Sequence, residues 1–322
     1  MEQMKCCEFT QEKAKAVIDE VSKIVIGQYE FIEQMVVVML AGGHALIEGV
    51  PGLAKTLAAK VMAKTVRSEF KRVQFTPDLM PADITGTKVF DAKSGSFYLK
   101  KGPLFTNIFL ADEINRTPPK TQAALLEAME ERAITIDGET HSLQEPFMVL
   151  ATQNPVEYEG TYPLPEAQLD RFMMKLVVDY IPQKFENMLL VKYNSGFSSY
   201  NLENEKISPV CSFEDIKRCR QEIQAVQVES GIINYITSIT RATRNSPSLI
   251  LGASPRASIS LLLAAKTFAA MQGRSFVTPD DVKDIAIPVL RHRIVLKPEA
   301  GIDGLKTDDV ARSILNKVEV PR

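Results

Sequence analysis

Residues 48–56 read Glu48-Gly49-Val50-Pro51-Gly52-Leu53-Ala54-Lys55-Thr56, a glycine-rich turn that ends in Lys-Thr. The turn joins an apolar run, Ala45-Leu46-Ile47, to a helical run that begins at Leu57. Such a turn leaves backbone N–H groups pointing inward, and the helix adds the positive end of its dipole. The stretch therefore predicts a phosphate-binding loop, in which Lys55 reaches the β and γ phosphates and the Thr56 hydroxyl joins a Mg²⁺ site.

Ala54 departs from the strict form of this motif, which has glycine at that position. Alanine fits there without strain only if its φ angle is negative. If the turn needs a left-handed residue, alanine costs on the order of 1–2 kcal/mol. The alternative interpretation of the stretch is an ordinary strand–turn–helix connection with an unrelated lysine.

A second motif, which contains two carboxylates, supports the interpretation of residues 48–56 as a phosphate-binding loop. The run from Asn107 to Ala111 is typical of a buried strand, and it ends in the adjacent carboxylates Asp112 and Glu113. This is the pattern of a Walker B element, in which Asp112 holds the Mg²⁺ shell and Glu113 orients and deprotonates the attacking water. The alternative is an acidic turn that caps the helix expected from Thr117-Pro118-Pro119.

Composition and charge exclude few functions. The 322 residues predict about two domains, and the balance of 38 Lys and Arg against 40 Asp and Glu gives no field that favours nucleic acid or an anionic membrane. Residues 1–8 lack the apolar stretch of a signal peptide, and the most apolar window, Met35 to Leu40, is too short to span a bilayer. We therefore expect a cytoplasmic protein without membrane insertion. Its four cysteines lack zinc spacing and are expected to be reduced thiols: Cys6, Cys7, Cys211 and Cys219.

The first half of the chain alternates apolar runs of strand length with helical stretches. The runs are Ala45–Glu48, Arg72–Phe75, Asn107–Ala111, Phe147–Ala151 and Phe172–Val178. Such alternation predicts a mostly parallel five-stranded sheet covered by helices on both faces. Ligands bind beyond the carboxyl ends of such strands, where both Lys55 and the Asp112-Glu113 pair fall.

Helical signals dominate the second half of the chain. Ser212 with Asp215 and Thr278 with Asp281 have the spacing of helix caps, and Ile232–Thr243 and Ala257–Met271 are amphipathic. We therefore expect a core domain at residues 1–181 and an all-helical domain at residues 182–322.

Taken together, these features resemble the MoxR family of AAA+ ATPases over nearly the whole chain. The resemblance lies in motifs that follow in the family's order: Val25-Ile26-Gly27-Gln28, Gly43-His44-Ala45-Leu46-Ile47-Glu48-Gly49, Thr76-Pro77-Asp78-Leu79-Met80-Pro81-Ala82-Asp83-Ile84-Thr85-Gly86, Asp112-Glu113-Ile114-Asn115-Arg116, Ala151-Thr152-Gln153-Asn154-Pro155, Leu164-Pro165-Glu166-Ala167-Gln168-Leu169-Asp170-Arg171-Phe172 and Gly252-Ala253-Ser254-Pro255-Arg256-Ala257. It implies an AAA+ P-loop NTPase core with a helical lid, and a ring-forming, chaperone-like ATPase that uses ATP and Mg²⁺.

The resemblance also implies site roles. The segment that packs against adenine corresponds to Ile26, Gly27 and Gln28, and the metal ligands to Thr56 and Asp112. Asn154 is the implied sensor 1 and contacts the attacking water or the γ phosphate; its alternative is a turn-forming Asn. The phosphate-binding positions are Gly49, Val50, Pro51, Gly52, Leu53, Ala54, Lys55, Thr56 and Leu57.

Several arginines are candidates for transition-state stabilisation. Arg171 fits the arginine finger that reaches a neighbouring subunit, although a surface ion pair with Asp170 is the alternative. Arg116 and Arg132 compete for this role, and Arg132 has the further alternative of complementing the end of its own helix. The resemblance makes Arg256 sensor 2, acting in cis, and a salt bridge to a nearby carboxylate remains the alternative.

Two inserted segments bear on what the protein acts upon. Residues 91–101 resemble the family's helix-2 insert, and residues 133–143 predict a hairpin with Asp137-Gly138 as its turn. Asp137 and Glu139 at that hairpin argue against nucleic acid and favour a protein client. The resemblance implies a homohexamer and a partner with a von Willebrand factor A domain. The alternatives are a nucleotide-gated binding module with a vestigial ATPase and a magnesium-chelatase-like or helicase-like motor.

Overall fold

A computed structural model describes residues 7–50, 52–154, 160–199, 202 and 205–321. Its strands are β1 Ala45–Glu48, β2 Phe70–Gln74, β3 Gly86–Asp91, β4 Ser96–Lys101, β5 Ile108–Asp112, β6 Ala133–Ile136, β7 Glu139–Ser142, β8 Met148–Gln153, β9 Met174–Val177, β10 Leu249–Leu251 and β11 Val295–Leu296. Its helices are α1 Glu8–Ser22, α2 Tyr29–Ala41, α3 Lys55–Thr65, α4 Pro81–Thr85, α5 Pro119–Glu131, α6 Glu166–Leu169, α7 Gln183–Asn194, α8 Phe213–Ala225, α9 Ser230–Arg244, α10 Pro255–Met271, α11 Pro279–Leu290, α12 Pro298–Ile302 and α13 Thr307–Lys317, with the 3-10 turn η1 at Ile114–Arg116.

The central sheet has five strands in the order β2-β5-β8-β1-β9, and every neighbouring pair is parallel. These are the five strands that the sequence predicts, with ends shifted by a few residues. β2 begins at Phe70 rather than Arg72, and β9 begins at Met174 because residues 169–172 form the end of a helical turn. The order places β5 and β1 on either side of β8, so the carboxyl ends of these three strands lie next to one another.

The inner strands β1, β5 and β8 are buried on both faces, which explains their continuous apolar runs. On β1, Ala45 and Ile47 pack into one cluster together with α1, α2 and α3, whereas Leu46 points into the other. That second cluster contains α5 and the hairpin β6–β7. The alternation follows from the two-residue period of a strand. It fixes which side of the sheet each helix covers.

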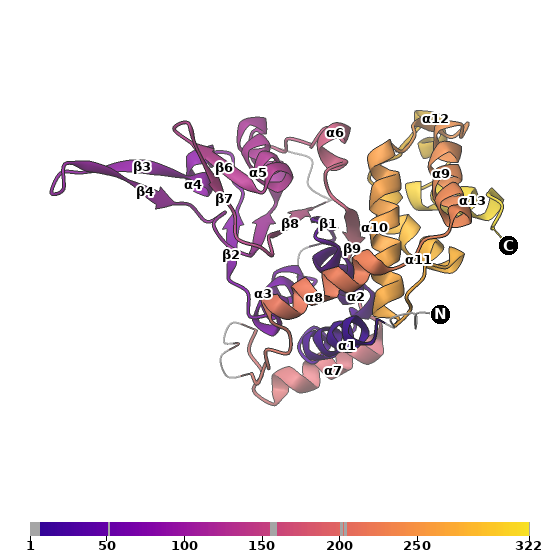
Figure 1. The fold of residues 1–322 in the computed structure, drawn as a ribbon, viewed down its shortest axis with the longest axis horizontal. Helices are drawn as coiled ribbons and strands as arrows, with labels where there is room; N and C mark the ends of the chain where they lie inside the picture. The colour runs from indigo at the N-terminus through magenta and orange to yellow at the C-terminus, as the bar shows by residue number, and fades with distance from the viewer. Residues whose placement is uncertain (1–6, 51, 155–159, 200–201, 203–204, 322) are drawn as a thin grey trace.

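Helices α9 to α13 gather at the end of the molecule opposite the β3–β4 hairpin, whereas α8 packs on α1 and α2 (Figure 1). α10 packs on α1 and α2, and the larger apolar cluster runs without interruption from the sheet into α10 and α11. The predicted caps are confirmed, because Ser212 and Thr278 accept from the backbone N–H groups of Asp215 and Asp281. The expected domain boundary at residue 181 stays a prediction.

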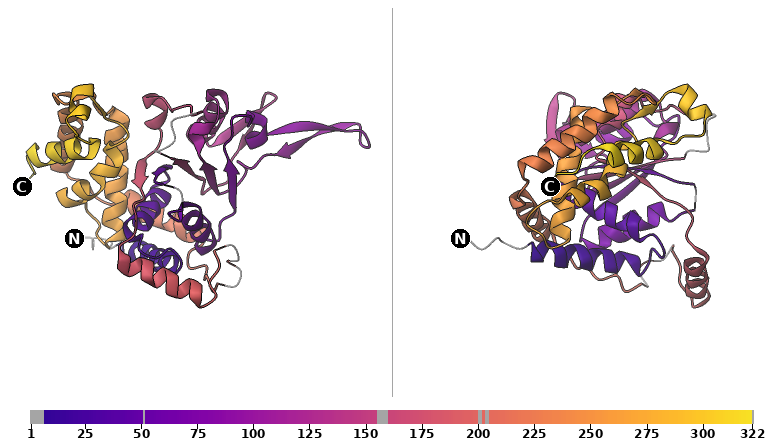
Figure 2. Two further views of the ribbon diagram at one scale, coloured as in Figure 1. Left: turned by 180° about the vertical axis from the view of Figure 1, so that it is seen from behind. Right: turned by 90° about the vertical axis from the view of Figure 1, so that its right-hand side faces the viewer.

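Two antiparallel hairpins are inserted between the strands of the central sheet in the sequence and form separate two-stranded sheets. β3 and β4 form a long antiparallel pair that projects away from the sheet (Figure 1 and the left view of Figure 2). β6 and β7 form the predicted hairpin, with Asp137 (φ 49°) and Gly138 (φ 81°) as its left-handed turn residues. Lys88 of β3 binds Glu139 of β7 at 2.7 Å, so the turn end of the β6–β7 hairpin is linked to the β3–β4 hairpin.

Three further expectations concern single residues and segments. Cys7, Cys211 and Cys219 are free and buried, and burial raises the pKa of the Cys211 thiol to about 12. Cys6 and Pro51 lie outside the described residues. Within the part of the chain that the structure describes, none of the helices is both long and apolar enough to cross a bilayer.

Candidate active site

The phosphate loop follows β1 and leads directly into α3, which begins at Lys55. Ala54 adopts a left-handed conformation at φ 58° and ψ 18°, so the strained alternative for this alanine is the one observed. Strain of this kind persists only where the surrounding structure imposes it, and it is concentrated at functional sites. The loop conformation is therefore kept although the residue suited to it, glycine, is absent.

Lys55 lies beside the acidic groups with which it is expected to work. Its Nζ donates to the carbonyl oxygen of Gly49 at 2.6 Å, across the base of the loop. Burial lowers the pKa of Lys55, and the negative charges of Asp112, Glu113 and Glu48 oppose that shift. Thr56 and Leu57, the next residues of α3, are half-buried beside it.

Asp112 ends β5 and is held by two neighbours. Arg72 on β2 donates to Asp112 Oδ2 from Nε at 2.9 Å and from Nη2 at 2.7 Å. The hydroxyl of Thr152 on β8 donates to Asp112 Oδ1 at 2.6 Å. The carboxylate is thus fixed between the two strands that flank β5.

Glu113 follows Asp112 in a left-handed backbone conformation with φ 57°. Its N–H donates to the Thr152 hydroxyl at 2.8 Å, and its carboxylate accepts from Gln74 at 2.7 Å and pairs with Arg116 at 2.8 Å. Neither Asp112 nor Glu113 caps α5, which begins after Pro118 without a side-chain cap. The alternative interpretation of the acidic pair as a helix cap is therefore wrong.

Asn154 follows β8, which lies between β5 and β1. Its side chain is buried, with 7% of its surface exposed. The residues expected to contact phosphate, metal and water thus follow three adjacent parallel strands. The structure brings together, at one edge of the sheet, Lys55 after β1, the Asp112-Glu113 pair after β5 and Asn154 after β8.

The segment expected to contact adenine packs against the chain that follows β9. Gly27 has φ 81°, and an added Cβ would lie 2.8 Å from Phe185 Cβ, so only glycine fits there. Gln28 donates from Nε2 to the Asp179 carbonyl at 2.8 Å. Gly27 and Gln28 line a polar cavity of about 350 Å³ that also includes Arg291 of the helical half. Ile26, the third expected residue, is half-buried next to them.

The donor set fits Mg²⁺. This ion binds oxygen ligands, keeps several waters, and in nucleotide sites takes one or two carboxylates together with substrate phosphates. The Thr56 hydroxyl and the Asp112 carboxylate are donors of that kind, and the phosphate loop precedes Thr56 directly. The ion would neutralise the charge that develops on the phosphates.

Arg171 and Arg256 meet at one carboxylate, which the sequence analysis did not single out. Glu130 near the end of α5 pairs through Oε2 with Arg171 at 2.9 Å and through Oε1 with Arg256 at 2.7 Å. For Arg171, the alternative surface ion pair is observed, but its partner is Glu130 and not Asp170. For Arg256, the alternative salt bridge is observed, and its partner is Glu130.

This arginine pair lies at the opposite edge of the sheet from Lys55. Arg171 precedes the amino end of β9, and the N–H of Met173 donates to the carbonyl of His44, just before β1. His44 in turn bonds through Nε2 to the Met129 carbonyl at 3.1 Å, which brings the end of α5 to the same edge. Because all five strands are parallel, the residues before the strands and those after them lie on opposite edges.

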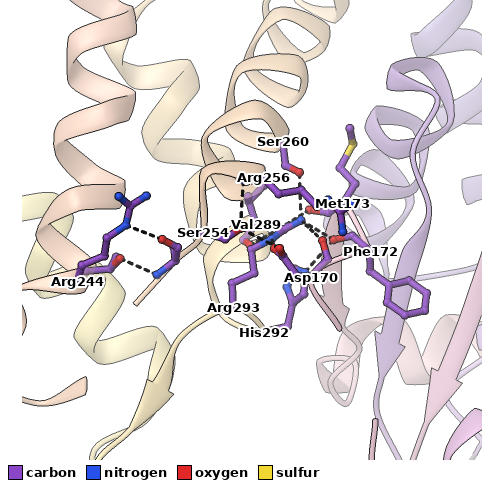
Figure 3. A network of polar contacts seen from close by, with 12 residues as sticks. Asp170, Phe172, Met173, Arg244, Ser254, Arg256, Ser260, Val289, His292 and Arg293 are labelled. Carbon is purple, nitrogen blue, oxygen red and sulfur yellow. Dashed lines mark hydrogen bonds and ion pairs between the residues drawn. The ribbon is translucent and has the colours of Figure 1, made fainter. Parts of the chain in front are cut away.

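Asp170 is instead clamped by the helical half (Figure 3). Arg293 donates from Nε to Asp170 Oδ1 at 2.7 Å, and Ser254 donates to Asp170 Oδ2 at 2.8 Å. The Arg293 side chain is 1% exposed and also donates to Ser260 and to the carbonyl oxygens of residues 170, 172, 173 and 289. Burial lowers the pKa of Arg293, and Asp170 opposes that shift.

The other candidate arginines have different surroundings. Arg116 pairs with Glu113 within the chain, as described above. Arg132 is left-handed at φ 50°, and it donates to the Gly42 carbonyl at the end of α2 at 2.9 Å and to Glu145 at 2.9 Å. Its guanidinium therefore complements the negative terminus of α2 rather than that of its own helix.

Several residues of the site escaped sequence reasoning. Thr152 belongs to the motif Ala151-Thr152-Gln153-Asn154-Pro155, but no role was predicted for it. It lies beside Asp112 because β8 is the neighbour of β5 in the sheet, so predicting its role requires the strand order. Arg72 and Gln74 point from an edge strand toward the acidic pair, and alternation along β2 marks them as sharing one face. Glu130 has no signal in the sequence, because its partner Arg256 is 126 residues away.

Two family models, several sequence relatives and a solved structure are similar to this chain. The ATPase family associated with various cellular activities (AAA) matches residues 44–174, and the AAA lid domain matches residues 241–314. Uncharacterized protein YeaC of Bacillus subtilis is 45% identical over 94% of this chain and 93% of its own length. Chaperone MoxR1 of Mycobacterium tuberculosis is 42% identical over 95% of this chain and 81% of its own. A crystal structure from Cytophaga hutchinsonii, of a protein assigned as an ATPase, has a TM-score of 0.89 and 42% identity, covering 98% of this chain and 97% of that one.

Proposed function

This chain belongs to the MoxR family of AAA+ ATPases, and from that premise we propose that it hydrolyses ATP with Mg²⁺ at sites shared between neighbouring copies. The observation that carries the proposal is the meeting of Lys55, the Asp112-Glu113 pair and Asn154 at the ends of three adjacent strands. An amine, a carboxylate pair and an amide at one edge of a parallel sheet suit a triphosphate and its attacking water.

Each residue has a part in the proposed reaction. Lys55 and the backbone of the loop bind the phosphates, and Thr56 and Asp112 hold the metal. Glu113 accepts a proton from water as the water oxygen attacks the γ phosphorus, and the bond from that phosphorus to the bridging oxygen of ADP breaks. Asn154 orients the water. The products are ADP and phosphate.

A second copy completes the site in this proposal. Arg171 lies at the edge opposite Lys55, so one chain does not bring its own Arg171 to its own phosphates. Arg256 shares Glu130 with Arg171, and this contact supports placing both arginines, rather than Arg171 alone, in the neighbour's site. The cis role expected for Arg256 is therefore replaced in the proposal by a role in trans.

The proposed cellular role is the remodelling of a protein client. The relative named as a chaperone supports this role, as does the acidic hairpin that carries Asp137 and Glu139. A hexameric ring and a partner with a von Willebrand factor A domain are further parts of the proposal. The oligomer is measured by light scattering with and without ATP, and a chain that stays monomeric at every concentration contradicts the ring.

The decisive experiment is Glu113→Gln. We expect hydrolysis to fall by at least about 100-fold, because the general base is lost, while the Kd for ATP changes little. Phosphate release and binding of a fluorescent ATP analogue measure the two quantities. Lys55→Ala is the matched comparison, because it should abolish binding as well. Hydrolysis by Glu113→Gln at the parental rate would show that Glu113 is not the base.

A further inference from the structure

Glu130 connects two arginines that come from different parts of the chain. Its two carboxylate oxygens are shared, Oε2 with Arg171 Nη1 at 2.9 Å and Oε1 with Arg256 Nη2 at 2.7 Å. Arg171 Nη1 also donates to the Leu126 carbonyl, one turn earlier on α5, at 3.0 Å. Two guanidinium groups this close repel each other unless an anion lies between them. Glu130 is that anion.

Each arginine keeps most of its donors for another ligand. A guanidinium has five N–H groups, and in these contacts Arg171 and Arg256 each use one terminal nitrogen. Their side chains are 33% and 45% exposed. A cavity of about 150 Å³ lies beside Glu130 and is lined by His44, Met129, Glu130 and both arginines. The remaining donors are therefore open to an approaching anion.

The backbones that carry the two arginines are fixed without Glu130. Asp170, next to Arg171 in sequence, is held by Arg293 and by Ser254, the N-cap of the helix that carries Arg256 (Figure 3). This clamp ties the start of β9 to the start of α10. Glu130 therefore acts on the direction of two side chains and not on the position of the elements.

We propose that Glu130 is a positioning residue of the ATPase that holds the guanidinium groups of Arg171 and Arg256 together, so that both donate to one phosphate group of the neighbouring copy. This inference rests on the proposed function. A pre-formed pair matters because a displacement of about 1 Å in a catalytic group lowers the rate by as much as 100-fold. Partly exposed ion pairs contribute little to folding stability, so the effect of Glu130 is expected in the rate.

The test compares Glu130→Gln with Glu131→Gln. Glu131 is the next residue on α5, is exposed, and has no ion pair with another described residue. A glutamine keeps the size of Glu130 but carries no charge, and its NH₂ group replaces one of the two acceptor oxygens with a donor that opposes a guanidinium. We expect kcat for ATP to fall by about 10- to 100-fold, KM to change by less than about twofold, and Glu131→Gln to match the parent. Glu130→Asp, which keeps both oxygens on a shorter stem, should fall in between.

A double-mutant cycle separates positioning from a merely structural role. If Glu130 acts through Arg171, then Glu130→Gln should add little to the loss already caused by Arg171→Ala. Full addition of the two losses overturns the proposal. So does a kcat for Glu130→Gln equal to or above that of the parent, provided that Arg171→Ala and Arg256→Ala each lower it. If the parent itself releases no phosphate from ATP, the proposed function fails, and this inference with it.

Discussion

Two residues of the candidate site adopt left-handed backbone conformations although neither is glycine. Ala54 ends the phosphate loop and Glu113 is the expected base, with φ angles of 58° and 57°. For Ala54 the sequence is compatible with a positive or a negative φ angle, because the φ angle of a loop residue depends on how strand and helix are joined. The structure selects the strained one. For Glu113 the conformation turns the side chain away from the direction of β5 and toward Gln74 and Arg116.

Ala54→Gly tests whether this strain costs folding free energy. Glycine adopts positive φ freely, so the free energy of unfolding should rise by up to about 1 kcal/mol, after the greater flexibility of the unfolded chain is subtracted. Ala63→Gly, inside α3, is the control and should lower the free energy of unfolding by about 1–2 kcal/mol, because it weakens the helix and removes a buried methyl group. Urea denaturation followed by circular dichroism measures both. Equal destabilisation by the two substitutions would contradict strain at Ala54.

At the scale of the elements, local patterns predicted strands and caps, whereas contacts between distant elements could not be predicted. The five strands and the caps at Ser212 and Thr278 follow from periodicity and spacing within a few residues. α7 was not predicted, because none of its residues is buried and it lacks a clear apolar face. The clamp of Asp170 by Arg293 spans 123 residues and depends on how α10 and α11 pack against β9.

Arg293→Met tests the importance of that clamp. The substitution fills a similar volume but leaves Asp170, whose side chain is 19% exposed, without its charged partner. We expect the free energy of unfolding to fall by about 3–5 kcal/mol, as for other broken buried ion pairs. Arg312→Met is the control, because Arg312 is 62% exposed and should change stability by less than about 0.5 kcal/mol. Similar unfolding midpoints for the two variants in urea would show that the clamp is dispensable.

At the scale of the whole molecule, the parallel sheet separates the two halves of the proposed active site. The phosphate loop and the acidic pair lie beyond the carboxyl ends of the strands, and the arginine pair lies at their amino ends. A contact between unlike faces of identical chains is heterologous, and it closes into a ring if the rotation between copies allows it. The positions of both sets of residues can be read from the sequence. Only the strand directions show that, within one copy, the two sets lie at opposite ends of the strands.

Mixing two inactive variants tests this arrangement directly. Glu113→Gln lacks the base but keeps the arginines, whereas Arg171→Ala lacks one arginine but keeps the base. If each site takes its base from one chain and its arginine from the next, a random mixture of the two should regain about a quarter of the parental sites. Phosphate release from the mixture, compared with each variant alone, measures the gain.

Pairing Glu113→Gln with Arg256→Ala should regain activity in the same way if Arg256 acts in trans. A double variant that carries both Glu113→Gln and Arg171→Ala in one chain is the control and should rescue neither. Since a site built within one chain leaves every chain of the mixture defective, mixtures no more active than their components would contradict shared sites.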